Sequence, residues 1–227
     1  MAADLAAFFG SDFAGKSFCH FKHQSTSLSA GVLTVTYPAG SSAPSAGAPY
    51  GGAQLCEAFA GGGARDATLS YDVRFPVGFQ FVQGGKLPGM YGGVQPFSGG
   101  GHNPDGWSMR LMWRANGAAE VYGYISNSTG YGDSWGRGSF SFQADGQWHH
   151  LSEHIHLNTP GQSDGSVTLS YDGSAHIRQT GLAITTTDTP IGGLYFSTFY
   201  GGHDSTWSPS DDMHIDFAGF RASRSGR

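Results

Sequence analysis

Hydrophobic and polar residues alternate along residues 67 to 75. Four apolar side chains would face one side and three polar ones the other: Leu69, Tyr71, Val73 and Phe75 against Ser70, Asp72 and Arg74. A period of two is typical of an antiparallel strand with one face on a core and the other in water. The segment therefore predicts a half-buried strand.

Short runs of the same character recur along the chain, and no long segment with a helical period separates them. Further strands are expected at 16–21, 32–37, 107–114, 119–127, 138–143, 148–157, 166–171, 175–179, 193–200 and 213–221. Many short strands at close spacing are typical of a sandwich or a jelly roll. We predict an all-β fold, a jelly-roll β-sandwich of two antiparallel sheets with a concave substrate cleft.

The composition agrees with this fold class. The chain has 37 glycines among 227 residues, 14% aromatic residues and only 13% charged residues, which favours short strands joined by glycine-rich turns. The length suits one β domain over residues 1–227. Within it, residues 38–53 are expected to form a surface loop, and residues 222–227 a frayed basic tail.

The connection between strands 107–114 and 119–127 decides which side chains share a face. Its sequence, Ala-Asn-Gly-Ala, suggests a two-residue turn at Asn116 and Gly117. Such a turn would oppose odd-numbered to even-numbered residues, yet the apolar rows of both strands are odd-numbered, as at Leu111 and Val121. Because opposed residues share a face, we predict an odd-length loop, such as three residues with a bulge, or a bulge within a strand.

The same parity gathers the even-numbered residues on the other face, and they are polar, cationic or aromatic: Ser108, Arg110, Arg114, Tyr122, Tyr124 and Ser126. Arg110 would lie across from Tyr122 or Tyr124. A saccharide chain can lie on such a face of a curved sheet; the alternative is a solvated outer face with ordinary cross-strand pairs. These residues, together with Lys86 in the preceding glycine-rich stretch, predict a site for an acidic polysaccharide.

Net charge and cysteine content limit the ligands, partners and cellular location that can be expected. The formal net charge is −5, so an anionic ligand must be held by a local cluster of cations, and a nucleic-acid partner is not expected. No run approaches the ~20 apolar residues of a membrane helix, so no membrane partner is expected. Cys19 and Cys56 lack zinc-site spacing and form either one disulfide, which would imply secretion, or two buried thiols. Residues 2–9 are too short an apolar run to be a complete signal peptide.

A chain of uronic acids can be cut without water by β-elimination. A base removes the C5 proton, and the bond from C4 to the glycosidic oxygen breaks as that oxygen takes a proton. The transition state places a second negative charge at the carboxylate, which Lys86, Arg110 and Ser108 could stabilise. A nearby cation lowers the tyrosine pKa from about 10. Tyr122 and Tyr124, two residues apart, could then act as base and acid, or one phenol could do both in turn.

At these residues the sequence resembles polysaccharide lyase family 14, which contains alginate and glucuronan lyases with a β-jelly-roll fold. The resemblance spans roughly residues 67 to 221. Its motifs are Gly-Lys-Leu-Pro-Gly at 85–89, Tyr-Gly-Gly at 91–93, Ser-Met-Arg-Leu-Met-Trp-Arg at 108–114, Tyr-Gly-Tyr at 122–124 and Phe-Ser-Thr-Phe-Tyr-Gly-Gly at 196–202. A similar Gly-Lys-Leu-Pro-Gly element occurs in the glucuronan lyases of family 20, which share the architecture.

The resemblance implies that five residues line the active cleft: Lys86, Ser108, Arg110, Tyr122 and Tyr124. In the family, the lysine and arginine engage the uronate carboxylate and the tyrosines shuttle protons. We assign catalysis to Lys86, Arg110, Tyr122 and Tyr124. We assign substrate binding to Ser108, Arg114, Tyr91, Tyr200 and His203. The resemblance leaves open which tyrosine is the base and whether His20, His23 or Gln54 contributes.

Two groups of residues raise the question of a metal ion. Four histidines lie close together at 149, 150, 154 and 156, but on a strand three of them face one way without an ordered set of carboxylates, which favours an exposed strand. Asp211, Asp212 and Asp216 could contribute to a structural calcium site. We assign no catalytic metal and expect no required cofactor.

Other activities fit the sequence less well. A glycoside hydrolase would need two suitably placed carboxylates, but the three glutamates, Glu57, Glu120 and Glu153, are widely scattered. Ser108 is not in the Gly-x-Ser-x-Gly motif of serine hydrolases. We predict a secreted, monomeric lyase that cleaves a β-1,4-linked polyuronate, alginate or glucuronan, by β-elimination. The alternative is a carbohydrate-binding module without catalysis.

Overall fold

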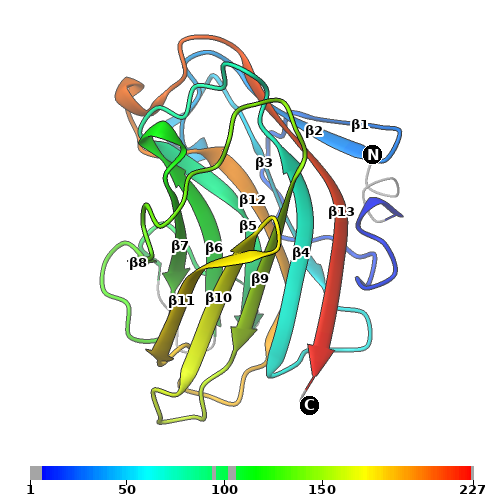
Figure 1. Cartoon of the computed structure of the whole chain (residues 1–227), viewed down its shortest axis with the longest axis vertical. Helices are drawn as coiled ribbons and strands as arrows, with labels where there is room; N and C mark the ends of the chain where they lie inside the picture. The colour runs from blue at the N-terminus through cyan, green and yellow to red at the C-terminus, as the bar shows by residue number, and fades with distance from the viewer. Residues whose placement is uncertain (1–6, 94–95, 102–105, 226–227) are drawn as a thin grey trace.

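The computed structural model describes residues 7–93, 96–101 and 106–225, and these form two antiparallel sheets packed face to face (Figure 1). The seven-stranded sheet has the order β1 (Thr26–Ser29), β2 (Val32–Tyr37), β13 (Met213–Ser225), β4 (Asp66–Arg74), β9 (His149–His156), β10 (Gly165–Tyr171) and β11 (Ser174–Leu182). The six-stranded sheet has the order β3 (Ala53–Ala58), β12 (Ile191–Tyr200), β5 (Gly84–Gly93), β6 (Gly106–Arg114), β7 (Ala119–Tyr124) and β8 (Asp133–Trp135). The all-β jelly-roll sandwich is confirmed.

Short 3-10 turns lie in the connections between described strands: η1 (Pro44–Ala46), η2 (Ala115–Gly117) and η3 (Ser205–Trp207). In the described part of the chain, no helix is long and apolar enough to cross a membrane.

Several strand predictions differ from the structure. Residues 16–21 and 138–143 form only isolated bridges, Phe18 to Cys56 and Ser141 to Ala118. Strands β1, β3 and β8 were not expected, and neither was β5, whose glycine content is typical of a loop. A frayed tail is wrong as far as Ser225, because Ala222–Ser225 continues β13 beside β4.

The core between the sheets is rich in aromatic side chains. Strand β4 contributes Leu69, Tyr71 and Val73, as its alternation predicted. Trp113 of β6 meets Tyr200 of β12 edge to face, at 5.5 Å between ring centroids. Buried apolar area of this kind is the main stabilising contribution to such a fold. The six-stranded sheet therefore turns its odd-numbered β6 residues inward and leaves its even-numbered residues to the opposite face.

The hairpin between β6 and β7 confirms the parity argument. Arg110 lies directly opposite Tyr122, and Trp113 opposite Ala119. The Arg114 amide donates to the Ala118 carbonyl at 2.7 Å, so three residues, 115–117, make the connection. Two of them, Asn116 and Gly117, adopt positive φ angles of 58° and 75°, a conformation that asparagine and glycine tolerate best. The polar rows of both strands consequently share one face.

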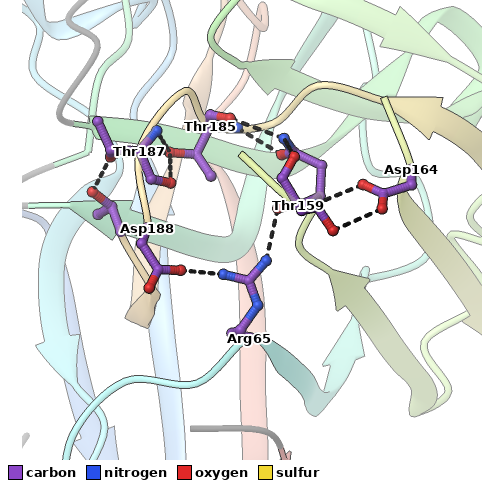
Figure 2. Close-up of polar contacts among 8 residues, drawn as sticks. Arg65, Thr159, Asp164, Thr185, Thr187 and Asp188 are labelled. Atoms are coloured by element: carbon purple, nitrogen blue, oxygen red, sulfur yellow. Dashed lines mark hydrogen bonds and ion pairs between the residues drawn. The ribbon is translucent and has the colours of Figure 1, made fainter. Parts of the chain in front are cut away.

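Loops at one end of the sandwich are tied together by side chains, as Figure 2 shows. Arg65 binds the Asp188 carboxylate and the Asn158 carbonyl. Buried Asn158 bonds both the amide and the carbonyl of Thr185, at 2.9 Å each. These contacts join the segment after β9, in the seven-stranded sheet, to the segment before β12, in the six-stranded sheet. They therefore fix the two sheets relative to each other at this end.

The two cysteines form a disulfide, Cys19–Cys56, which fixes the N-terminal segment to edge strand β3. The cysteines are 37 residues apart in sequence. We expect the double substitution Cys19→Ser/Cys56→Ser to lower the free energy of unfolding by about 2–4 kcal/mol, since the open chain gains conformational entropy when unfolded. Denaturant unfolding of both proteins without reductant measures this. A change below about 0.5 kcal/mol would show that the bridge does not stabilise the fold.

Candidate active site

A cleft with a volume of about 510 Å³ lies on the face of the six-stranded sheet that points away from the core. Its floor comes mainly from three adjacent strands, β5, β6 and β7, which contribute Lys86, Arg110, Met112, Arg114, Tyr122 and Tyr124. Residues from connecting segments complete the lining, among them Pro44, Ser45, Ser98, Tyr131, His203 and Trp207. All four predicted catalytic residues therefore lie in one cleft.

Lys86 of β5 is the best defined of these groups. Its side chain is only 7% exposed. The amine donates to the sulfur of Met112 at 2.8 Å and lies 3.3 Å from the ring centroid of Tyr122. Burial holds the pKa of Lys86 well below its usual value, and the positive charges of Arg110 and Arg114 lower it further. A lowered pKa favours the uncharged amine, which is the form that can accept a proton.

Arg110 lies at the centre of β6 with 1% of its surface exposed. It donates to the hydroxyl of Ser197 on β12 at 3.0 Å, and its guanidinium carbon lies 4.6 Å from the ring centroid of Tyr195. Among the described residues, no hydrogen-bond partner satisfies its Nε. A buried guanidinium with a spare donor is well suited to bind a carboxylate.

A short chain of hydrogen bonds supports the floor beside Arg110. The amide of Gln54 on β3 accepts from the Tyr195 hydroxyl at 2.8 Å and donates to the Cys19 carbonyl at 2.9 Å. Gln54 itself lines the cleft, whereas His20 and His23 do not. Gln54 therefore contributes to the cleft. Its side-chain amide is held in place by the hydrogen bond to Cys19, a member of the disulfide.

The charge of Arg114 is partly neutralised by a carboxylate, Glu120, whose place beside the cleft the sequence did not predict. Glu120 of β7 is fully buried and accepts from the Arg114 Nε at 2.8 Å and from the Ser134 hydroxyl at 2.7 Å. Arg137 approaches the same carboxylate at 3.8 Å. Since Arg114 already holds a carboxylate, Arg110 is the cation better placed to bind a uronate.

Tyr122 and Tyr124 stand side by side on β7, with ring centroids 5.7 Å apart. Burial raises the pKa of Tyr122 above its usual value, and Tyr124 raises it further, against the opposing charges of Arg114 and Arg110. Arg114 and Arg110 do lower the pKa of Tyr122, as expected, but burial outweighs them, so the expected net lowering of this pKa does not occur. Tyr122 stays protonated at neutral pH and can donate a proton.

Three of the predicted substrate-binding residues do not line the cleft. Ser108 is fully buried and donates to the Phe97 carbonyl at 2.5 Å. Tyr91 packs beside the disulfide against Phe18, at 5.8 Å between ring centroids. Tyr200 is part of the core, because its position on β12 points between the sheets, where its hydroxyl donates to the Gln80 carbonyl. Ser108 and Tyr91 thus lie on the same face of the sheet as the cleft but are covered by other residues, whereas Tyr200 lies behind the sheet.

The other two do line it. Arg114 lies in the floor, and His203 lies in the wall, where its Nδ1 is 3.3 Å from the Ser45 hydroxyl. The strand face alone did not reveal Met112, Tyr131 or Trp207 as lining residues. Met112 shares the even parity of β6 and could have been included on that ground, whereas the other two come from connecting segments.

The four histidines lie on strand β9, as predicted, and three of them contact aspartates of the neighbouring strand β4. His154 and His156 both contact Asp66, and His150 contacts Asp72 at 2.7 Å. Asp216, considered for calcium, instead accepts two hydrogen bonds from Arg74. Within residues 7–93, 96–101 and 106–225, no three His, Cys, Asp or Glu side chains are grouped to hold a metal ion.

Comparison with known proteins finds matches over most of the chain. The family model for polysaccharide lyase 14 matches residues 25–220. The PL-14 alginate lyase from Aplysia kurodai is 29% identical with a TM-score of 0.79, covering 92% of this chain and 90% of that one. Alginate lyase vAL-1 from a Chlorella virus is 22% identical with a TM-score of 0.80, covering 98% and 97%.

A more distant structure shares the fold alone. The endo-β-1,4-glucuronan lyase from the fungus Trichoderma reesei is 12% identical with a TM-score of 0.56, covering 92% of this chain and 88% of that one. A search of curated protein sequences found no significant match.

Proposed function

We propose, since the chain belongs to polysaccharide lyase family 14, that it cleaves a β-1,4-linked polyuronate, alginate or glucuronan, by β-elimination. The observation that carries the proposal is the grouping of Lys86, Arg110, Tyr122 and Tyr124 around one cleft on three adjacent strands. The likeness to alginate lyases supports alginate as the first substrate to test.

In this mechanism Arg110 binds the carboxylate of the sugar that loses its C5 proton. Its spare Nε–H and its burial support this role, because a hydrogen bond from a buried cation strengthens as negative charge develops. Ser197 and the ring of Tyr195 hold the guanidinium in place. The preorganised donor thus stabilises the carbanion-like transition state.

Lys86 takes the C5 proton. Its depressed pKa supports the uncharged amine as the base, whereas the raised pKa of Tyr122 makes a phenolate base unfavourable. As the bond from C4 to the glycosidic oxygen breaks, the Tyr122–Tyr124 pair gives that oxygen a proton. The products are a C4–C5 unsaturated sugar and a new hydroxyl end. Proton return from the lysine ammonium to the tyrosine, directly or through solvent, restores the resting state.

An extracellular location is part of the proposal. The disulfide Cys19–Cys56 supports it, because such bonds persist in oxidising compartments. We also propose that the enzyme acts as a monomer and needs no cofactor, since the cations and proton donors for the reaction all come from one chain.

The decisive experiment is incubation with alginate and with glucuronan while following absorbance near ~235 nm, where the conjugated product absorbs; the chemistry expected is base-assisted elimination. A rise with either polymer supports the proposal. If no polyuronate gives a rise although the polymer binds, the protein is a carbohydrate-binding module instead.

The pH profile tests the assignment of Lys86. Because the amine must be uncharged, kcat should rise with pH through the lowered pKa of Lys86 and then level off. Arg114→Gln removes a charge that lowers this pKa and leaves Glu120 less well neutralised, and both changes favour the ammonium. We expect the acid limb of the variant to move to higher pH by about half to one unit. A shift toward lower pH would contradict the assignment.

A further inference from the structure

Strand β5 contains a bulge between Lys86 and Tyr91. Leu87 pairs with Leu111 of β6, but Met90 pairs with Met109, so two residues of β5 stand opposite one residue of β6. Leu87 and Met90 are three residues apart and yet both point into the core, which a regular strand would not allow. The bulge is therefore what lets the motif place Lys86 in the cleft and Met90 in the core.

The bulge lies against the backbone of Arg110. Its two residues, Pro88 and Gly89, oppose Arg110 in the ladder. A Cβ atom at Gly89 would come within 2.2 Å of the Met109 carbonyl oxygen and 2.6 Å of the Arg110 Cα. The glycine is thus required by this close approach. Any shift of the bulge moves the backbone next to the two groups that the proposed elimination needs, Lys86 and Arg110.

Two polar side chains reach this bulge from the opposite sheet. Tyr71 of β4 donates its hydroxyl to the Pro88 carbonyl at 2.9 Å, in the core. Glu153 of β9 is 1% exposed; burial raises the pKa of its carboxyl well above the usual value, and the nearby backbone N–H of Met90 opposes part of that rise. Neither of its carboxyl oxygens has a hydrogen-bond partner of normal geometry among the described residues. Both side chains lie on neighbouring strands, where Leu69 pairs with Glu153.

A carboxyl group in this position destabilises the fold. Its immediate partners across the ladder are Leu69 and Leu169, both fully buried. Burying a polar group without full hydrogen bonding destabilises a protein, and an apolar residue of similar size would be more favourable. A stabilising role alone therefore does not account for Glu153.

We propose that Tyr71 and Glu153 are positioning residues that hold the β5 bulge, and through it Lys86 and Arg110, in the geometry for elimination. This inference rests on the proposed lyase function. Tyr71 fixes the bulge at the Pro88 carbonyl, and Glu153 faces its far end at the Met90 amide. The seven-stranded sheet thus contributes to catalysis without any residue in the cleft.

The variant Glu153→Met tests the proposal, because the proposal predicts that this substitution keeps or raises stability but lowers activity. The variant should melt at the same temperature as the wild type or higher, since a poorly bonded carboxyl is removed from the core. Its kcat should fall about 10- to 100-fold, the loss that a misplacement of about 1 Å can cause. KM should stay within about threefold, because the cleft surface is unchanged. Glu153→Gln keeps an oxygen acceptor of the same size and should restore kcat to within about threefold of the wild type.

Tyr71→Phe is the second variant, and Tyr171→Phe is its matched control. Tyr171 is a buried tyrosine of the same seven-stranded sheet, but its hydroxyl accepts from the Gln143 amide, away from β5. Both substitutions should lower the melting temperature, and Tyr71→Phe alone should lower kcat. Equal kcat values for the two variants would show that loss of a buried hydrogen bond, and not the bulge, is responsible.

The outcomes separate this inference from the proposed function. If the wild type does not cleave any polyuronate, the lyase proposal fails, and the positioning role that rests on it fails with it. If the wild type is active and Glu153→Met keeps full kcat, the positioning role is wrong and the lyase function stands. If Glu153→Met loses both stability and activity, and Glu153→Gln does not recover activity, Glu153 is a structural residue only.

Discussion

Lys86→Met is expected to lower kcat on a polyuronate by about 10²- to 10⁴-fold, the range that a general base contributes. Methionine has a similar length and is apolar, so it can pack against Met112 and the Tyr122 ring while losing the N–H···S hydrogen bond and the amine's contact with the ring. Because the amine is proposed to be uncharged at rest, polymer affinity should change only a few-fold. Initial rates near ~235 nm and binding of the polymer to the variant measure the two effects separately.

Two further variants show whether the lysine works as a base or as a cation. Lys86→Arg keeps a positive charge that cannot be given up near neutral pH, so a base role predicts a loss comparable to that of Lys86→Met. A role in neutralising the carboxylate predicts substantial activity instead. Lys16→Met removes one lysine at an exposed position outside the cleft, and it should retain full kcat. Turnover of Lys86→Met within threefold of the wild type would rule out the base assignment.

The placement of the site could be predicted largely from two strands. The apolar rows of β6 and β7 have the same parity, which by itself requires an odd loop and puts Arg110 on the face of Tyr122 and Tyr124. Burial of the odd-numbered row decides this register energetically, because a slip by one residue would expose Trp113 and bury Arg110 in the core. The prediction needed no knowledge of the rest of the fold.

Lys86 could not be placed in the same way, because its strand does not keep a regular period. The bulge at Pro88 and Gly89 changes the face on which every later residue of β5 lies. No short-range pattern reveals this, since the cause is the close approach to Arg110 and the hydrogen bond from Tyr71. The resemblance to a family supplied what periodicity could not.

Protonation states were the least predictable property of the site. Near cations, a tyrosine is expected to lose its proton more easily, and the sequence places Arg110 and Arg114 near Tyr122. The structure adds burial and a second phenol, which raise the tyrosine pKa, and the same burial lowers the pKa of Lys86. Desolvation depends on the whole cleft, including loops far away in sequence. The mechanism we propose therefore takes Lys86 as the base and keeps the tyrosines as the acid, whereas the sequence predicted tyrosines for both roles.

The double variant Tyr122→Phe/Tyr124→Phe should bind the polymer about as well as the wild type and lose kcat by about 10²- to 10⁴-fold, because the leaving oxygen no longer receives a proton. The rings remain, so the contact between Lys86 and Tyr122 is kept. Tyr131→Phe removes a hydroxyl from an exposed tyrosine of the same cleft and serves as the control.

The single variants identify the acid. If one hydroxyl delivers the proton, its removal should lower kcat nearly as much as the double substitution, and the other single variant should lose less than about tenfold through the changed environment of its neighbour. Two intermediate losses would instead indicate that the pair passes the proton along its own hydrogen bond. A double variant that keeps kcat within threefold of the wild type would show that the proton comes from solvent or from Lys86 itself, and the tyrosines would then be binding surfaces.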